Sequence, residues 1–296
     1  MAVRRIPSPS SPSGKDKKPS ALSSSKSAPP KLRKNPVLEQ KRLQDLEIET
    51  AKQNIRANPN DPFAVNALGV AYKNRKMPLK AIQAYEDALQ IDPNFVLAYY
   101  NLGIIYKEQG RTEKALEAYK TAIEINKAFT PPYINLGNIY FSQGKVHKAI
   151  EIYKLAIQAD KTDAVAHKNL GVAYLQIERL DKSLSAFEDA IRYEPSDEET
   201  QKFMGMAHKQ RRAIRSMIKD IYEQITQNPS NLDLRYKIAQ IYYQAGFLQN
   251  ALDEYNVILQ MKPSSEIALK YIPLIEQEIE EDELDEEKKA SQDDLK

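Results

Sequence analysis

The residue types that most often carry out chemistry are few and scattered in this sequence. The three histidines, His147, His167 and His208, are far apart, and none forms a His-x-x-x-His pair of the kind that binds zinc. There is no cysteine, which removes thiolate nucleophiles, thiolate metal ligands and disulfides. No glycine-rich loop is present that could surround a phosphate. The sequence therefore predicts a protein that is not an enzyme and holds no metal or cofactor.

One polar residue type does recur at a fixed spacing. Asn101, Asn135 and Asn169 each stand directly before a Leu-Gly pair, in segments that read YNLG, INLG and KNLG, and successive members are 34 residues apart. An asparagine amide both donates and accepts hydrogen bonds, which is what the main chain of a bound peptide requires. These amides must therefore be presented by a repeated element of the chain.

The same spacing governs the neighbouring residues and defines six units of 34 residues over 62–265. Apolar residues recur at helical spacing in two segments of each unit, which predicts a pair of helices. A glycine inside a helix costs about 1 kcal/mol relative to alanine, so its recurrence predicts close approach of the partner helix. Large side chains of the second helix should fill the space between helices. The recurring glycines are Gly69, Gly103, Gly137, Gly171 and Gly205, and the large residues are Tyr85, Tyr119, Tyr153, Phe187, Ile221 and Tyr255.

The series Leu-Gly-x-x-Tyr, Ala, Tyr or Phe, Ala and Pro resembles the tetratricopeptide repeat (TPR) family at matching offsets. The resemblance covers about two thirds of the chain, although the family's tryptophan at the fourth position of the unit is absent. It implies an all-α, right-handed TPR solenoid of stacked helix-turn-helix units. Units one to six are residues 62–95, 96–129, 130–163, 164–197, 198–231 (degenerate) and 232–265.

Unit five departs most from the pattern. Gly110, Gly144 and Gly246 are expected to make the turn between the two helices of units two, three and six, whereas unit five has no turn glycine. Its segment HKQRRAIRSMIKDIY is also compatible with one long helix. Because the pattern resumes without a shift at Ile238, we expect an ordinary hairpin.

The segments outside the repeats have contrasting charges. Residues 1–36 are rich in Ser, Pro and Lys with a net charge of +8, and residues 282–296 continue the acidic C-terminal end. Both are expected to be disordered tails, because neither could bury enough apolar surface to offset the entropy of ordering. Residues 37–61 predict a flanking helix, and residues 266–281 a capping helix that Pro273 should bend or interrupt.

No apolar run approaches the length of a membrane-spanning helix, and the first residues contain no hydrophobic signal segment. We therefore expect a cytoplasmic protein without membrane insertion.

The resemblance to the TPR family also implies a ligand-binding groove lined by the first helix of each unit. Asn101, Asn135 and Asn169 then occupy the sixth position of consecutive units and Asn138 a ninth position. This row is similar to the asparagine-lined TPR superhelix of O-GlcNAc transferase, whereas the lysine and asparagine pattern of the chaperone-binding carboxylate clamp does not match. The other candidate groove residues are Asn66, Tyr100, Ile134, Phe141 and Lys168.

We therefore expect a non-enzymatic TPR scaffold or adaptor that binds a peptide or helix of a partner protein in this groove. Two alternatives remain open from the sequence. The repeats could assemble the protein with copies of itself. The basic tail, together with the cations of unit five, could instead associate with nucleic acid, although the nearly neutral middle of the chain makes this partner unlikely.

Overall fold

The computed structural model describes residues 35–293, with side chains described as far as residue 284. This part of the chain is all-α, and no strand occurs within it. The described chain divides into two units between Arg42 and Leu43. The first contributes only the beginning of α1 to the described residues, and residues 1–34 of the predicted basic tail lie outside them. The helices are α1 (Pro36–Ala57), α2 (Pro62–Asn74), α3 (Pro78–Ile91), α4 (Val96–Glu108), α5 (Thr112–Ile125), α6 (Pro131–Ser142), α7 (Val146–Ala159), α8 (Ala164–Gln176), α9 (Leu180–Tyr193), α10 (Glu198–Gln227), α11 (Leu232–Gln244), α12 (Leu248–Met261) and α13 (Glu266–Asp293).

Side-chain caps explain where several of these helices begin. Asp61, Asp163 and Asp197 each accept a hydrogen bond from a backbone N–H in the first turn of α2, α8 and α10. Asn231 does the same for α11, and the hydroxyl of Ser265 accepts a backbone N–H of α13. Such a cap contributes about 1 kcal/mol. All five residues directly precede a unit or the last helix, so the caps follow the 34-residue spacing.

Units one to four are helix pairs whose packing depends on glycine. A Cβ added to Gly69 would lie only 2.4 Å from the ring of Tyr85, so alanine does not fit there without movement. The equivalent distances are 2.4 Å for Gly103 and Tyr119, 2.4 Å for Gly137 and Tyr153, and 2.6 Å for Gly171 and Phe187. The prediction that these glycines allow close approach of the partner helix is confirmed in units one to four.

The turns inside the helix pairs use one left-handed residue each. Gly110, Gly144 and Gly246 have φ of 71°, 73° and 83°, as predicted for the turns of units two, three and six. Lys76 and Glu178 adopt the same conformation at the matching positions of units one and four, with φ of 58° and 63°. Glycine adopts this conformation without a steric clash because it has no Cβ. Lys76 and Glu178 adopt it at a small cost in free energy.

Unit five is not a hairpin, and our expectation for it was wrong. α10 is a single helix of 30 residues that includes Arg212 at the turn position. A Cβ added to Gly205 would meet nothing within 4 Å, because no second helix of the unit folds back against it. Ile221, which stands where the other units have an aromatic ring, packs instead beside Ile238 of α11. α10 therefore packs on α9 with its first half, through Phe203 and neighbours, and on α11 with its second half.

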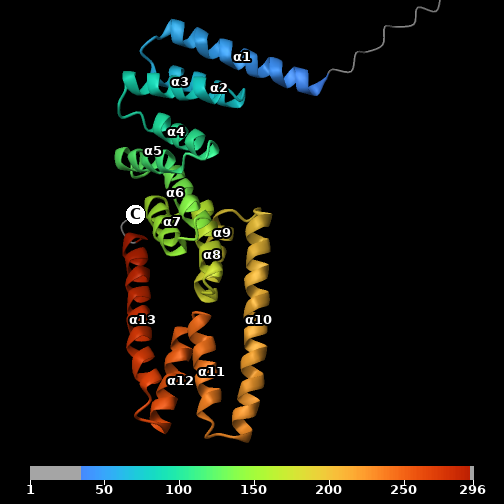
Figure 1. The fold of residues 1–296 in the computed structure, drawn as a ribbon, viewed down its shortest axis with the longest axis vertical. Helices are drawn as coiled ribbons and strands as arrows, with labels where there is room; N and C mark the ends of the chain where they lie inside the picture. The colour runs from blue at the N-terminus through green and yellow to red at the C-terminus, as the bar shows by residue number, and fades with distance from the viewer. Residues whose placement is uncertain (1–34, 294–296) are drawn as a thin grey trace, which may run out of the picture. The chain divides into compact units, whose positions relative to one another are not determined.

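Because α10 does not turn back, the following helices return alongside it toward unit four (Figure 1). The turn between α11 and α12 contacts the start of α9. The backbone N–H of Leu180 donates to the carbonyl of Ala245 at 3.0 Å, and the guanidinium of Arg179 donates to the carbonyl of Tyr243 at 2.8 Å. Leu180 and Ala245 are also members of one buried apolar cluster. The C-terminal helices are thus fixed to unit four by contacts distant in sequence.

The last helix is longer than predicted. α13 continues to Asp293 instead of ending at residue 281, and Pro273 lies inside it without ending it. On the side that faces α9, Arg179 pairs with Glu278 at 2.7 Å and Lys182 with Asp282 at 2.6 Å. Of the predicted acidic tail, residues 294–296 and the side chains beyond residue 284 lie outside the described residues.

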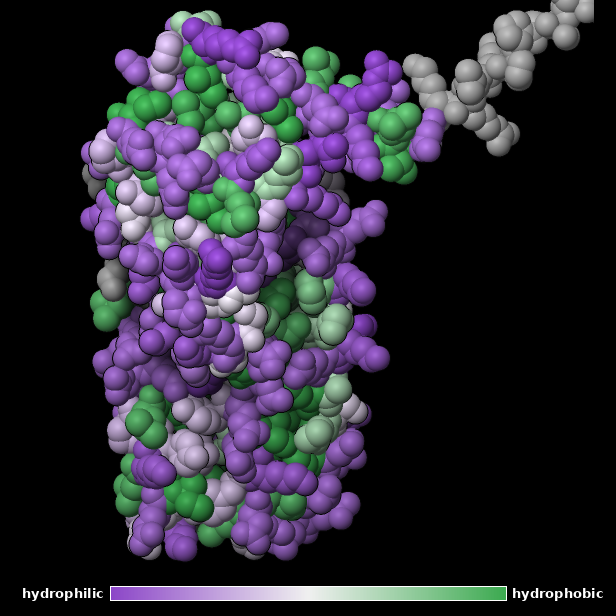
Figure 2. All heavy atoms as spheres, turned by 45° about the horizontal axis from the view of Figure 1, so that its top comes forward, coloured by the Kyte–Doolittle hydropathy of each residue, from purple (hydrophilic) through white to green (hydrophobic). Residues whose placement is uncertain are grey.

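The apolar core is divided into clusters along the stack, and each cluster joins adjacent helices. Tyr153, Leu170 and Ala173, for example, belong to one cluster that links α7 to α8. This is the arrangement expected of a repeat protein, whose units bury their apolar faces against their neighbours. Hydrophilic side chains cover much of the face seen in Figure 2, with apolar residues in separate patches between them. None of the described helices is both long enough and apolar enough to cross a membrane.

Candidate functional site

The first two predicted groove asparagines bond to each other. The amide nitrogen of Asn101 in α4 donates to the amide oxygen of Asn66 in α2 at 2.9 Å. Both side chains are buried, with 9% and 8% of their surface exposed. This pair therefore connects units one and two, and little of either amide faces solvent.

Asn135 lies further along the stack, in α6, and is half-buried. Its amide nitrogen reaches the hydroxyl of Tyr100 in α4 at 3.5 Å, which is a long hydrogen bond. The ring of Tyr100 in turn packs edge-on against Phe129, with 5.4 Å between ring centroids. Ile134 is half-buried beside Asn135 on α6 and packs against the apolar cluster of units three and four.

Asn138 and Asn169 form the centre of the site. Asn138 accepts a hydrogen bond at 2.6 Å from the hydroxyl of Tyr153 and another at 3.3 Å from the amide nitrogen of Asn169. Both asparagines are half-buried. The corresponding buried hydroxyls of Tyr85 and Tyr119 find no partner among the described residues, because the ninth positions of units one and two carry aliphatic side chains. Burial raises the pKa of Tyr153, which keeps its hydroxyl protonated as a donor.

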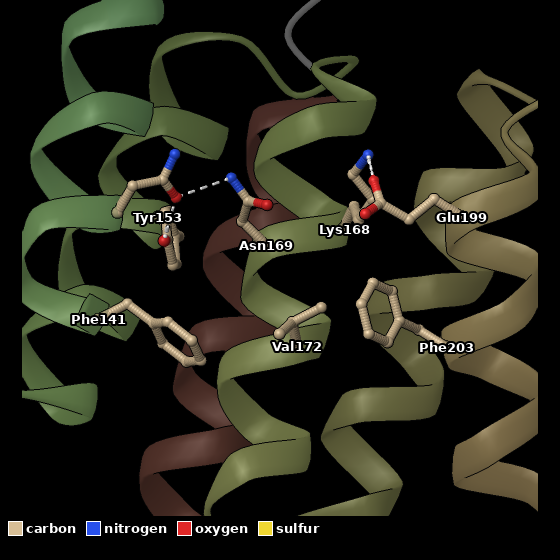
Figure 3. A pocket seen from close by; sticks show the side chains of 8 residues that line it. Phe141, Tyr153, Lys168, Asn169, Val172, Glu199 and Phe203 are labelled. Atoms are coloured by element: carbon tan, nitrogen blue, oxygen red, sulfur yellow. Dashed lines mark hydrogen bonds and ion pairs between the residues drawn. The ribbon is translucent and has the colours of Figure 1, made fainter. Parts of the chain in front are cut away.

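A pocket of about 170 Å³ opens beside these amides. Its residues come from α6, α7, α8 and the first turns of α10, and they are Asn138, Phe141, Tyr153, Lys168, Asn169, Val172, Glu199 and Phe203. Figure 3 shows Phe141, Val172 and Phe203 along one side and the polar groups along the other. The pocket therefore has an apolar wall and a polar rim.

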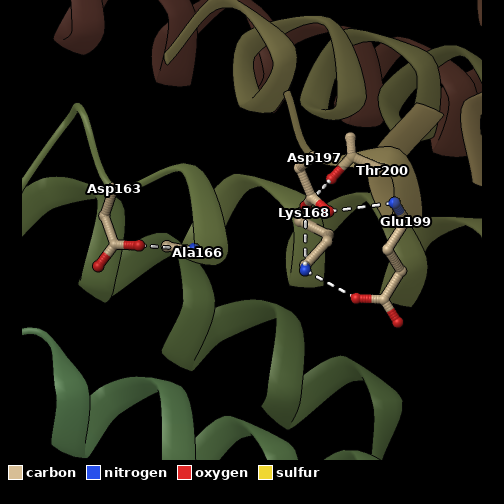
Figure 4. A network of polar contacts seen from close by, with 6 residues as sticks. All are labelled: Asp163, Ala166, Lys168, Asp197, Glu199 and Thr200. Atoms are coloured by element: carbon tan, nitrogen blue, oxygen red, sulfur yellow. Dashed lines mark hydrogen bonds and ion pairs between the residues drawn. The ribbon is translucent and has the colours of Figure 1, made fainter. Parts of the chain in front are cut away.

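Lys168 is held by two carboxylates at the rim (Figure 4). Its ammonium lies 2.8 Å from Glu199 and 3.1 Å from Asp197. Asp197 also accepts a hydrogen bond at 2.7 Å from the hydroxyl of Thr200, and it caps α10. The group thus connects α8 to the start of α10 and fixes the α10 side of the pocket.

The same contacts set the charges of this group. The hydroxyl of Thr200 and the ammonium of Lys168 hold the pKa of Asp197 below its ordinary value of 3.8. Burial lowers the pKa of Lys168, but hydrogen bonds to Glu199 and Asp197 outweigh burial and raise it. Both groups are therefore charged at neutral pH.

Four of the site residues predicted from the sequence, Asn138, Phe141, Lys168 and Asn169, come together in this pocket. Tyr153, Glu199 and Phe203 also line it but were not predicted as site residues. Phe203 occupies the sixth position of unit five, where units two to four have asparagine, and Glu199 occupies the second position of unit five. Continuing the unit register into unit five would have found both residues. Asn66, Tyr100, Asn101, Ile134 and Asn135 lie on the same row of first helices but do not line the pocket.

The histidines and carboxylates of the described residues form no cluster of the kind that binds a metal ion. No group of three or more histidines and carboxylates there could hold a metal ion. His167 is buried, with one ring nitrogen 2.9 Å from the carbonyl of Lys161 and the other 3.8 Å from a carboxylate oxygen of Asp189. These contacts link His167 to the end of unit three and to α9 of unit four.

Comparison with protein families identifies the repeats. The family model described as tetratricopeptide repeat matches residues 96–129, a second model of that description matches residues 166–197, and a model described as TPR repeat matches residues 80–110 and 137–178. The chain thus contains tetratricopeptide repeats, and the part of it that the structure describes is an all-α solenoid. No curated protein matches it.

Several solved TPR structures are similar to parts of the chain. A chain of the APC/C hetero-tetramer Cut9-Hcn1 is 17% identical over 80% of this chain, with a TM-score of 0.49. This chain spans 46% of the length of that one. MamA is 27% identical over 54% of this chain and 94% of its own, with a TM-score of 0.46. YrrB, described as a TPR protein with an unusual peptide-binding site, is 17% identical over 76% of this chain and 98% of its own, with a TM-score of 0.43.

Proposed function

We propose that the protein binds an extended or helical segment of a partner protein in a groove lined by α6, α8 and the first half of α10. Tetratricopeptide repeats are in general protein-interaction modules without catalytic activity, and models of these repeats match residues 80–129 and 137–197 of this chain. The observation that carries the proposal is the pocket at the junction of units three, four and five, which combines an apolar wall with a row of amides.

The size of the pocket suits one side chain of the partner. Sites for small molecules and cofactors usually enclose about 300–1,000 Å³, which exceeds the 170 Å³ found here. Phe141, Val172 and Phe203 give it an apolar wall. Full burial of a Leu or Phe side chain contributes about 1.5–3 kcal/mol, which is enough for a dominant anchor in a short interface.

The amides supply the polar part of the recognition. An asparagine side chain has two N–H donors and an acceptor oxygen, and the bond from Asn169 to Asn138 uses only one donor of Asn169. Asn135, Asn138 and Asn169 therefore retain hydrogen-bonding capacity for the main chain of a bound segment. The buried pair Asn66 and Asn101 instead holds the neighbouring units in position.

The experiment compares two variants that place the same residue at the same position of different units. Val172 and Val70 both occupy the ninth position of a unit and are both half-buried, but only Val172 lines the pocket. Peptides are selected from a random displayed library on the full chain and their affinities measured by fluorescence anisotropy. We expect Val172→Arg to weaken the selected peptides about tenfold or more, because it fills the pocket and removes the anchor contact.

The control is Val70→Arg, which should bind the same peptides with wild-type affinity. Circular dichroism of both variants verifies that the helices are retained. Equal binding by Val172→Arg and the wild type would contradict the proposed groove, as would loss of binding in Val70→Arg alone.

A further inference from the structure

The straight form of α10 creates a basic surface that a hairpin would not have. Arg212, Arg215 and Lys219 are spaced by three and four residues, so on a continuous helix they lie on one face, which we call the basic stripe. In a hairpin Arg212 would be in the turn and the three would be separated. All three are exposed.

The basic stripe has little internal compensation. Lys219 lies 3.9 Å from Glu223, with 78% of its side chain exposed, which is a weak surface contact. Neither Arg212 nor Arg215 forms an ion pair with any residue in the described part of the chain. The guanidinium groups of Arg212 and Arg215 and the weakly paired ammonium of Lys219 can therefore all meet an acidic surface.

A matching acidic surface lies on α13. Glu276, Glu280 and Glu283 are spaced by four and three residues and are all exposed, which defines the acidic stripe. On another face of the same helix, Glu278 and Asp282 already pair with cations of α9. α13 therefore binds basic residues within its own chain and presents a second row of carboxylates outward.

The two stripes do not meet within one molecule. α10 packs on α8, α9 and α11, whereas α13 packs chiefly on α12. In Figure 1, α11 and α12 lie between α10 and α13. Within the described residues, neither stripe therefore has its partner in the same molecule.

We propose that the basic stripe of one copy binds the acidic stripe of a second copy, with α10 and α13 antiparallel. In that direction the spacings coincide, three residues and then four along both helices. Arg212 faces Glu283, Arg215 faces Glu280, and Lys219 faces Glu276. No other offset of the two helices aligns all three pairs.

This proposal goes beyond the proposed function and does not depend on it. The pocket is lined from α6, α7, α8 and the first turns of α10, so residues 212–219 leave it uncovered. Each copy carries both stripes, so the contact is head-to-tail and can join successive copies or close a ring. Several grooves would then act together on a partner that carries repeated binding segments.

Self-association of this kind should be weak and sensitive to salt, because exposed ion pairs contribute little and are screened. The measurement is the weight-average mass of the full chain by sedimentation equilibrium, across a range of concentrations at low and at high salt. At low salt we expect a mass that rises with concentration above that of the monomer. At high salt we expect the association constant to fall about tenfold or more.

Charge reversal tests the pairing itself. The basic-reversed variant is Arg212→Glu, Arg215→Glu and Lys219→Glu, and the acid-reversed variant is Glu276→Lys, Glu280→Lys and Glu283→Lys. Each variant alone should remain monomeric, because like charges then face each other. An equimolar mixture of the two should associate again, since the basic-reversed α10 cannot pair with a wild-type α13 but each reversed stripe finds its complement in the other variant.

Matched controls carry the same change in net charge at exposed sites elsewhere. They are Lys107→Glu, Lys120→Glu and Lys127→Glu in one chain, and Glu86→Lys, Glu117→Lys and Glu151→Lys in another. Both should associate as the wild type does. The proposal is overturned if the wild type stays monomeric at low salt, if either reversed variant associates like the wild type, or if mixing the two reversed variants does not restore association.

Discussion

Asp197 has two roles at the edge of the pocket. Its carboxylate caps α10 through the backbone N–H of Glu199, and it also binds the ammonium of Lys168 on α8. The hydroxyl of Thr200 adds a third contact. One side chain therefore determines both where α10 begins and how it is held against unit four, so the geometry of the pocket depends on its charge.

This charge should make the stability of the protein depend on pH. The pKa of Asp197 is lower in the folded protein than its ordinary value of 3.8. Its contribution is therefore fully present above that value and is lost as the pH falls through the lower, folded pKa. Asp197→Asn retains a good cap but removes the charge. We expect the variant to unfold at a lower temperature than the wild type near neutral pH, and the difference to disappear in strong acid.

The control for this experiment is Asp163→Asn, at the start of α8. Asp163 is also a capping aspartate, but it forms no ion pair with a cation among the described residues. Its substitution should change the unfolding temperature by an amount that varies less with pH. If Asp197→Asn and the wild type differ equally at neutral pH and in strong acid, the ion pair with Lys168 does not stabilise the junction.

The element that determines the architecture is α10. The helix pairs of units one to four depend on a ring packed against glycine, but in unit five the ring is replaced by Ile221, which packs on α11. Without that contact there is no internal partner to hold a hairpin closed. The straight helix then directs α11, α12 and α13 back toward unit four.

Two glycine substitutions distinguish the helix pairs of units one to four from the straight helix of unit five. Gly103→Ala should destabilise the protein by about 1–3 kcal/mol, because the new Cβ would lie 2.4 Å from the ring of Tyr119. Gly205→Ala should stabilise it by about 1 kcal/mol, because the site is helical and open and alanine has the higher helix propensity. Denaturant unfolding followed by circular dichroism measures both. A destabilising Gly205→Ala would indicate a folded-back unit five.

Most of the helices could be predicted from the sequence, because glycine, tyrosine and capping residues repeat at a fixed spacing. The form of unit five could not. Lys76 and Glu178 show that a turn does not require glycine, so the missing turn glycine did not decide between hairpin and helix. The straight form of α10 depends instead on contacts distant in sequence, such as that between Leu180 and Ala245.

At the scale of the whole molecule, the repeats provide a row of first helices, and the junction of units three, four and five provides the pocket. The sequence predicted the row of asparagines but not how their amides are used. Asn66 and Asn101 are paired and buried, whereas Asn138 and Asn169 lie at the pocket. That difference depends on which residues face the asparagines on neighbouring helices. The 34-residue spacing alone does not predict those residues.

The central claim is that a partner segment occupies this groove, and photo-crosslinking tests it most directly. A photoreactive phenylalanine analogue replaces Phe141 at the pocket in one chain and Leu155, exposed on α7, in another. Each is irradiated with a peptide selected on the wild-type protein, and the adducts are measured by mass spectrometry. We predict crosslinks from position 141 and none from position 155. Crosslinking from position 155 alone, or equally from both, would contradict the groove as the binding site.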